Sequence, residues 1–249
     1  MSSIELTQFA GGASGMAIAA GMWVFVVWCW MTGGQDRGRV VSAGGLMAAG
    51  GVGASVLSGW LVGGFGLSSL GAIAGGTAVG LALVGPFRFV DSGDLDCLIP
   101  AGVAGLSVAR LGCLVEGCDF GRIGEVGPTV VYGSGSRAWE YHVAEYGLSP
   151  MSSTSMAVYP FAGYLAIWGL GCAVFGQWWR RRGAADGKAA VVSGVAFLIG
   201  GGAIEWLREP ATVVNIVDGV SVYPLIYWLA AVAAVVGSRW SKFGSGVSP

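Results

Sequence analysis

The chain has 249 residues, of which 54% are hydrophobic and only 11% are charged. Soluble domains carry about 25% charged residues, so this composition excludes an ordinary globular protein and predicts an all-α, polytopic membrane protein. The formal net charge of −1, with no basic tract longer than Arg180-Arg181-Arg182, excludes a nucleic-acid partner.

Apolar runs of about twenty residues, long enough to cross a hydrocarbon core of about 30 Å, predict seven membrane helices in a single transmembrane domain over residues 1–249. Alternating the loops between the two sides of the membrane puts most Lys and Arg residues on one side. By the positive-inside rule that side is cytoplasmic, so the N-terminus is expected outside and the C-terminus inside. The expected spans are 10–31, 41–63, 67–87, 97–115, 156–178, 189–207 and 221–238.

Two features of the chain ends and helix ends support this topology. The start Met1-Ser2-Ser3-Ile4-Glu5 lacks a basic region, so no cleavable signal peptide is expected. Aromatic residues gather at the ends of the apolar runs, as Tyr223 and Tyr227 do, and this is typical of the membrane interface.

The longest segment between expected spans, residues 116–155, is expected outside the membrane as a lid or binding element. Its stretch 138–146 is aromatic and polar, which favours a short interfacial helix. His142 in this stretch is the single histidine of the sequence, so any imidazole base must be this residue. A solvent-exposed histidine in a loop without function is the alternative interpretation.

An arginine, Arg110, lies inside the apolar span 97–115, about five residues from its end. Placing Arg at the centre of a membrane helix costs about 2.5–3.5 kcal/mol on insertion scales, so Arg110 is a candidate for a functional site. The alternative is an arginine whose long side chain reaches the membrane interface from near the helix end.

A second polar group ends the sixth expected span, where Glu205 and Arg208 share a helix face and Pro210 stops the helix. In the expected topology this end lies outside, as does the end of the Arg110 span. Because guanidinium groups match the geometry of phosphate, the combination predicts an anionic-headgroup site. Ion pairs that only lock helices four and six together are the alternative. The residues expected to converge are Arg110, Glu116, Asp119, Arg122, Glu205 and Arg208.

Tyrosine and cysteine side chains are expected on the same side. Tyr164 lies one turn after the helix-entry residue Pro160, where its hydroxyl can point to a polar cavity. Cys113 and Cys118 flank Gly117, and a turn at this glycine would bring them together as a redox pair. Two packing thiols are the alternative. The five cysteines are too scattered for a metal site, and no cofactor is expected.

The run from Arg110 to Arg122 resembles the signature of the prolipoprotein diacylglyceryl transferases, which move diacylglycerol from phosphatidylglycerol onto the cysteine of a lipobox. It is closest to a divergent branch of that family with Cys in the signature. Asp96, Pro100 and the stretches 159–164 and 204–210 resemble other family motifs in the same order, so the resemblance covers about residues 66–238. The positions that keep the family residue are Arg110, Gly112, Gly117, Gly121, Tyr164, Glu205 and Arg208.

The resemblance implies a multi-pass protein of the bacterial cytoplasmic (inner) membrane with an outward N-terminus. It also implies a phospholipid partner similar to phosphatidylglycerol, with a lipoprotein precursor or other envelope proteins as further partners. On the retained residues, the expected catalytic residues are Arg110, Glu205 and His142, and the expected substrate-binding residues are Arg110, Tyr164, Arg208, Gly121 and Glu116.

The chain departs from the family mainly at positions that carry proton transfer. Leu70 stands where the family has a catalytic His, and Gly201 stands where it has an Arg one turn before the helix-six Glu. Cys113 and Cys118 replace the signature Asn and Glu. Leu165 stands where the family has a Glu directly after the tyrosine that corresponds to Tyr164. What remains is the half of the family site that holds the headgroup.

The sequence therefore predicts a diacylglyceryl-transferase-like protein that binds an anionic phospholipid headgroup. If it is an enzyme, it transfers a lipid-derived group to a cysteine thiol of a lipoprotein precursor. The first alternative is a catalytically inactive relative that binds lipid or lipoprotein within an envelope complex. The second is a membrane thiol oxidoreductase that uses Cys113 and Cys118.

Overall fold

Helices make up most of the chain in the computed structural model, which agrees with the expected all-α membrane fold. The structure describes residues 4–6, 13–33, 36–61, 75–76, 78–80, 82–83, 89–184, 186–209, 215–217, 220–221 and 223–243. The helices are α1 (Ala13–Thr32), α2 (Arg37–Leu61), α4 (Ser92–Glu116), α5 (Arg137–Glu145), α6 (Phe161–Arg181), α7 (Lys188–Ile204), the short 3₁₀ helix η2 (Glu205–Leu207) and α8 (Tyr223–Phe243). The strands are β1 (Ile4–Leu6), β2 (Val130–Tyr132), β3 (Asn215–Val217) and β4 (Val220–Ser221).

Several described helices are long and apolar enough to cross a membrane, so the chain is a multi-pass membrane protein. Within the described ranges these are Gly15–Thr32, Ser92–Glu116, Phe161–Arg181 and Lys188–Leu207, with a shorter apolar stretch at Tyr223–Val235. The seven-span count and the orientation of the termini stay predictions. Most of the expected span 67–87, including Leu70, lies outside the described residues.

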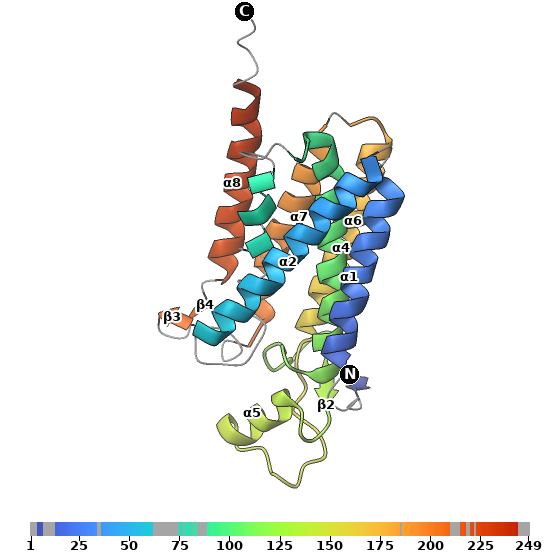
Figure 1. Ribbon diagram of the computed structural model, residues 1–249. Coiled ribbons are helices and arrows are strands. Elements are labelled where there is room, and N and C mark those ends of the chain that lie inside the picture. Colours follow the sequence, from blue (N-terminus) through green and yellow to red (C-terminus); the bar gives the residue numbers. More distant parts are fainter. Residues whose placement is uncertain are drawn as a thin grey trace, which may run out of the picture.

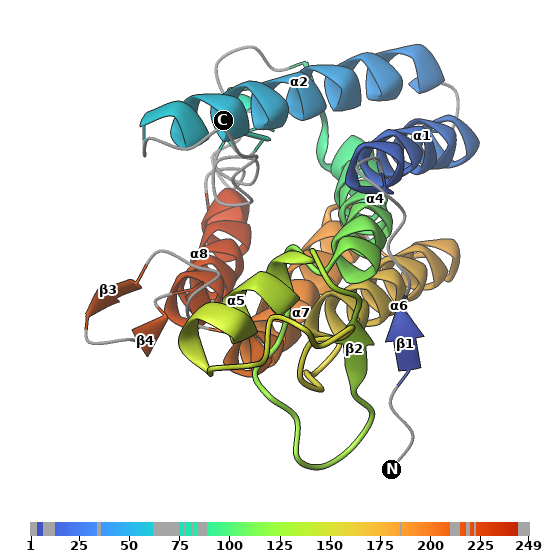
Figure 2. The ribbon, with the colours of Figure 1, turned by 90° about the horizontal axis from the view of Figure 1, so that it is seen from below.

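Helix α4 lies in the middle of the bundle, between α1 on one side and α6 and α7 on the other (Figures 1 and 2). Gly21 of α1 and Gly105 of α4 let the two backbones approach closely, because a methyl group on either would collide with the carbonyl oxygen of the other. Small residues are what close helix packing in lipid requires. The central position of α4 places Arg110 inside the bundle.

The first turn of α4 is polar, and the helix therefore begins earlier than its apolar pattern predicts. Asp94 accepts a hydrogen bond from the backbone N–H of Asp91 at 3.0 Å, in the manner of a capping box. Two residues later, the buried Asp96 carboxylate accepts hydrogen bonds from the backbone N–H groups of Gly187 (2.9 Å) and Ala190 (2.7 Å) at the start of α7. Helix α4 thus fixes the position of α7, whose other end carries Glu205.

The segment between α4 and α6, called the outer segment below after its expected place outside the membrane, folds into a small unit at the lower end of the bundle (Figure 1). Helix α5 and strand β2 belong to it. Strand β2 pairs in parallel with β1 near the N-terminus, a contact that the sequence did not predict. The unit has its own buried apolar cluster of Phe120, Val130, Tyr132, Ala138 and Val158. The predicted helix at 138–146 is present as α5.

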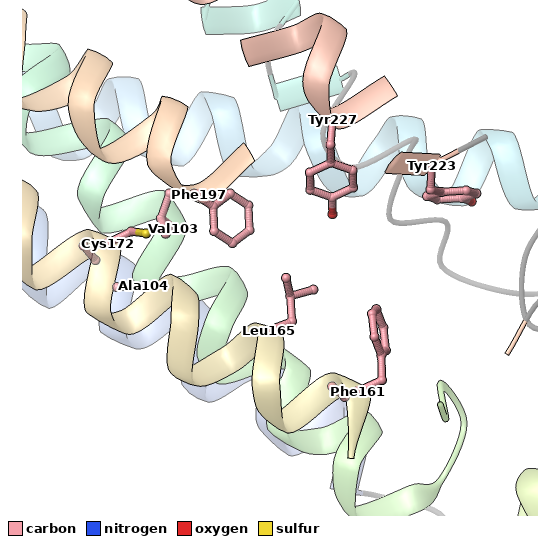
Figure 3. Packing of buried hydrophobic residues seen from close by; sticks show 10 residues of the cluster. Val103, Ala104, Phe161, Leu165, Cys172, Phe197, Tyr223 and Tyr227 are labelled. Carbon is pink, nitrogen blue, oxygen red and sulfur yellow. The ribbon is translucent and has the colours of Figure 1, made fainter. Parts of the chain in front are cut away.

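The main apolar core is built from side chains of α4, α6, α7 and α8 (Figure 3). Tyr223 and Tyr227 of α8 face Phe161 and Leu165 of α6 across the core. The two tyrosines, expected at the membrane interface, are only 8% and 4% exposed. Their four-residue spacing puts both rings on the inward face of α8, so they pack inside the bundle, and their depth in the membrane stays a prediction.

Candidate functional site

Four charged side chains form an ion-pair cluster where α4 and η2 end. Asp119, three residues after α4, pairs with Arg110 through Oδ2, and the Nε of Arg208 lies 2.7 Å from Asp119 Oδ1. Arg208 Nη1 also donates to Glu205 Oε2 at 3.3 Å. The structure thus brings together Arg110, Asp119, Glu205 and Arg208, which are called the ion-pair cluster below.

The cluster is largely withdrawn from solvent, and Arg110 is its most accessible member. The Arg110 side chain is 16% exposed, whereas those of Asp119 and Arg208 are 7% exposed and that of Glu205 is fully buried. An unpaired charge in such a place would cost several kcal/mol, so each cation needs its carboxylate. The alternative in which Arg110 only reaches the membrane interface does not describe this arrangement, because the guanidinium is paired.

Two groups of the cluster keep unused hydrogen-bonding capacity. Within the described part of the chain, Arg110 hydrogen-bonds to Asp119 through one nitrogen, and its other N–H groups have no protein acceptor. Glu205 Oε1 is buried and likewise lacks a hydrogen-bond partner among the described residues. An unpaired buried acceptor costs about 1–3 kcal/mol, so a donor from a bound molecule would stabilise the site.

The guanidinium group of Arg208 is held by more protein contacts than that of Arg110. Its guanidinium carbon lies 5.3 Å from the centre of the Phe161 ring and 5.2 Å from that of the Tyr223 ring. Two such cation–π contacts hold the guanidinium between α6 and α8. We therefore assign Arg110, rather than Arg208, as the cation with capacity for a ligand.

A backbone clamp around Gly121 holds Asp119 against η2. The N–H of Gly121 donates to the carbonyl of Tyr159 at 3.2 Å, and the N–H of Arg122 donates to the carbonyl of Leu207 at 2.8 Å. A methyl group on Gly121 would lie 2.5 Å from the Tyr159 oxygen and 2.8 Å from the Leu207 oxygen. Both neighbours are backbone atoms, so only glycine fits without moving one of these segments.

Replacing Gly121 with Ala is expected to lower the free energy of unfolding by about 1–3 kcal/mol, because overpacking must displace backbone. The matched control is Gly102→Ala in α4, where an added methyl group meets nothing within 4 Å. That change should be neutral or stabilising by up to about 1 kcal/mol, since Ala is the better helix former. Thermal unfolding in detergent measures both, and equal melting temperatures would contradict the clamp.

Tyr164 and Arg122, two further residues of the predicted site, donate hydrogen bonds to backbone carbonyl groups. The Tyr164 hydroxyl donates to the carbonyl of Pro128 at 3.1 Å and so ties α6 to the outer segment. The Tyr164 side chain also lines an apolar groove of about 450 Å³ on α6 and α7. Arg122 Nε donates to the Arg208 carbonyl at 3.3 Å, and Glu116 is the last residue of α4.

Cys113 and Cys118 lie together, as the predicted turn requires. Gly117 ends α4 in the left-handed region with φ 64°, and its N–H donates to the carbonyl of Cys113 at 3.0 Å. The two thiol groups are close enough to interact, and they do not form a disulfide. Their redox role stays a prediction.

His142 is buried, with only 1% of its surface exposed, so the expectation of a solvent-exposed histidine is wrong. Its Nδ1 accepts a hydrogen bond from the backbone N–H of Met156 at 3.2 Å. The ring packs edge-on against Phe120 and Tyr146 at centroid distances of 5.8 and 5.6 Å. The residue is buried because α5 turns this face onto the core of the outer segment; its role as a base stays a prediction.

Burial lowers the pKa of His142 below its usual value of 6.5, and this predicts acid sensitivity. Between the two pKa values the unfolded chain binds more protons than the folded chain, so stability rises with pH. The contribution of His142 is therefore complete above pH 6.5 and is lost as pH falls below it. Melting temperatures from about pH 7.5 to about pH 5 should fall more steeply for the wild type than for His142→Asn, which keeps a side-chain acceptor. Parallel pH profiles would contradict this account.

The position of Gly201 is explained by Tyr227. A methyl group on Gly201 would lie 3.0 and 3.2 Å from two ring carbons of Tyr227, which therefore occupies the space beside this glycine. The contact between Tyr227 and Gly201 could not be predicted from the sequence, because it joins α7 to α8. Its four-residue spacing from Tyr223 was the one available signal of a buried face.

Comparison with known proteins relates part of the chain to a class of membrane transferase. No protein-family model matches the chain. A stretch of 90 residues, 36% of the chain, is 34% identical to phosphatidylglycerol–prolipoprotein diacylglyceryl transferases from three strains of Dehalococcoides mccartyi. The chain is distantly related to these transferases. The match spans about a third of the length of these relatives, 34% of each, so their activity is not transferred by the comparison alone.

Proposed function

We propose that the chain is a diacylglyceryl-transferase-like membrane protein whose ion-pair cluster binds the headgroup of an anionic phospholipid. The observation that carries the proposal is the unused capacity of Arg110 beside the unpaired Glu205 Oε1. Guanidinium N–H groups fit the oxygens of a phosphate, and Glu205 offers an acceptor to a headgroup hydroxyl. A headgroup that carries both a phosphate and a hydroxyl matches Arg110 and Glu205. Phosphatidylglycerol, which appears in the name of the relatives, has such a headgroup.

Ion pairing that merely locks the helices explains only part of the cluster. A lock accounts for the Asp119 carboxylate, which joins α4 to Arg208 after η2. It leaves the remaining N–H groups of Arg110 and the buried Glu205 oxygen without a function. A bound headgroup would use both, and for this reason we favour a ligand site over a purely structural one.

The reaction implied by the relatives is a substitution at carbon. The sulfur of a cysteine thiol forms a bond to the diacylglycerol carbon, the bond from that carbon to the phosphate oxygen breaks, and glycerol phosphate leaves with the electron pair. Arg110 would stabilise the charge on the departing phosphate, which is usually a large electrostatic contribution. The thiol proton needs an acceptor; His142 is held within the outer segment, and Glu205 is the carboxylate in the cluster with an unpaired oxygen.

The test is a transfer assay on the purified full chain in detergent. Phosphatidylglycerol labelled in its headgroup is mixed with a lipobox peptide, and the released glycerol phosphate is measured against an authentic transferase. Release that depends on Arg110 would support the transferase. Retention of the lipid without release would support the inactive, lipid-binding alternative, and neither retention nor release would contradict the proposal.

A second candidate function, membrane thiol oxidoreductase, is favoured by the contact between Cys113 and Cys118. The two thiols would form a disulfide and pass two electrons and two protons to a disulfide of a client protein, which becomes two thiols. Mass spectrometry after alkylation, with and without exposure to oxidised glutathione, tests this candidate. Two thiols that stay alkylatable under oxidising conditions would count against it.

A further inference from the structure

A cationic pocket lies at the end of the bundle away from the ion-pair cluster, where α1 and α6 end (Figure 1). Helix α6 starts at Phe161, beside Arg208, so the basic residues at its last turn are a full helix length from the cluster. The cavity has a volume of about 280 Å³. It is lined by Met31, Thr32, Gln177, Arg180 and Arg181.

The two arginines of this pocket have no ion-pair partner in the part of the chain that the structure describes. Among the described residues, Arg180 and Arg181 take part in no salt bridge, whereas Arg39 at the same end pairs with three carboxylates. Arg180 Nη1 donates to the carbonyl of Thr32 at 2.8 Å and lies 2.8 Å from the sulfur of Cys97. These neutral contacts position the guanidinium and leave its charge available for an anion.

Gln177 adds an unsatisfied acceptor to the same pocket. The residue is 8% exposed, and its buried Oε1 lacks a hydrogen-bond partner within the described ranges. A buried amide oxygen is normally paired, so a donor on a bound molecule is the simplest way to satisfy it. The pocket therefore combines two cations with one acceptor.

The surroundings place this pocket at the level of lipid headgroups. Trp178 and Trp179, beside the pocket residues on α6, are 42% and 40% exposed, and Trp30 near the end of α1 is 55% exposed. Exposed tryptophans at helix ends are typical of the membrane–water interface. Basic pockets between membrane helices at this level are a known form of headgroup site.

We propose that Arg180 and Arg181 bind the phosphate of a phospholipid in the leaflet opposite the ion-pair cluster. Gln177 Oε1 accepts a hydrogen bond from a hydroxyl or ammonium group of the same headgroup. This site is independent of the proposed function, because it shares no residue with the ion-pair cluster. By the charge distribution of the loops, its leaflet is the cytoplasmic one.

The experiment compares Arg181→Gln with Arg182→Gln in the full chain. Arg181 lines the pocket, whereas Arg182 stacks on the Trp178 ring at 4.1 Å and does not line it. Intact-protein mass spectrometry in detergent counts bound dimyristoyl-phosphatidylglycerol during a titration. We expect Arg181→Gln to weaken one binding event about tenfold or more, because a charge-assisted contact is lost, and Arg182→Gln to leave it within about twofold.

Further arms separate the possible ligands. Arg110→Gln should leave this binding event unchanged. A failure of the Arg181 proposal can therefore be distinguished from a failure of the proposed function at Arg110. Inorganic phosphate at millimolar concentration should not displace the lipid. Equal effects of Arg181→Gln and Arg182→Gln would overturn the proposal, as would retention of inorganic phosphate with no lipid binding that depends on Arg181.

Discussion

Replacing Asp119 with Asn is expected to lower the free energy of unfolding by about 3–5 kcal/mol, because breaking a buried ion pair leaves an uncompensated charge. Asp119 is the one carboxylate that contacts both Arg110 and Arg208 in the described structure. Among the described residues, its loss would leave Arg110 with no carboxylate partner and would remove from Arg208 the carboxylate that lies 2.7 Å from its Nε. Equilibrium unfolding in mixed detergent micelles measures the change.

The control for this prediction is Asp36→Asn, which also removes a carboxylate from an arginine. The Asp36 side chain is 66% exposed, and its partner Arg39 keeps Asp91 and Asp94. An exposed pair is screened by solvent, so stability should not change measurably. Equal destabilisation by the two substitutions would show that burial of the ion-pair cluster contributes nothing.

Replacing Arg110 with Gln is expected to weaken the binding of phosphatidylglycerol at the ion-pair cluster about 100-fold or more, because two charge-assisted hydrogen bonds to phosphate are lost. Asp119 keeps Arg208 as a partner in this variant, so the outer segment should remain attached to η2. The measurement is a titration of the purified protein with the lipid, followed by intact-protein mass spectrometry.

Arg137→Gln is the matched control for Arg110→Gln, because Arg137 is an exposed arginine at the start of α5, in the segment beside the cluster. It changes the net charge by the same amount and should leave lipid affinity unchanged. Arg110→Lys adds a second comparison: it keeps the charge but loses the planar fork, so an intermediate affinity is expected. Equal lipid affinity of the wild type and Arg110→Gln would show that Arg110 does not bind the headgroup and only stabilises the structure.

Charged residues in apolar spans gave the strongest information in the sequence. Arg110, Glu205 and Arg208 are conspicuous because ionisable residues are rare in such spans. The expected topology also puts the end of the Arg110 span and the end of the Glu205 span on the same side of the membrane. Asp119 was also predicted from the sequence to lie with these charged residues. The sequence did not show that Asp119 contacts both arginines, because that depends on the backbone clamp at Gly121, which joins three distant segments.

Other features were beyond sequence reasoning for a similar reason. The burial of His142 depends on how α5 packs on Phe120, and the pairing of β1 with β2 joins residues more than a hundred positions apart. Hydropathy also misplaced the start of α4, because the capping residues Asp91 and Asp94 are polar. Local patterns predict helices well, but contacts between distant segments require the assembled bundle.

The most direct test of the central claim is an experimental structure of the full chain in a membrane disc that contains phosphatidylglycerol. The account predicts phosphate density within hydrogen-bonding distance, about 3 Å, of the Arg110 guanidinium. It also predicts a headgroup hydroxyl on Glu205 Oε1, with Asp119 still bridging the two arginines. Lipid that occupies the disc but leaves Arg110 in contact with Asp119 alone would contradict the claim.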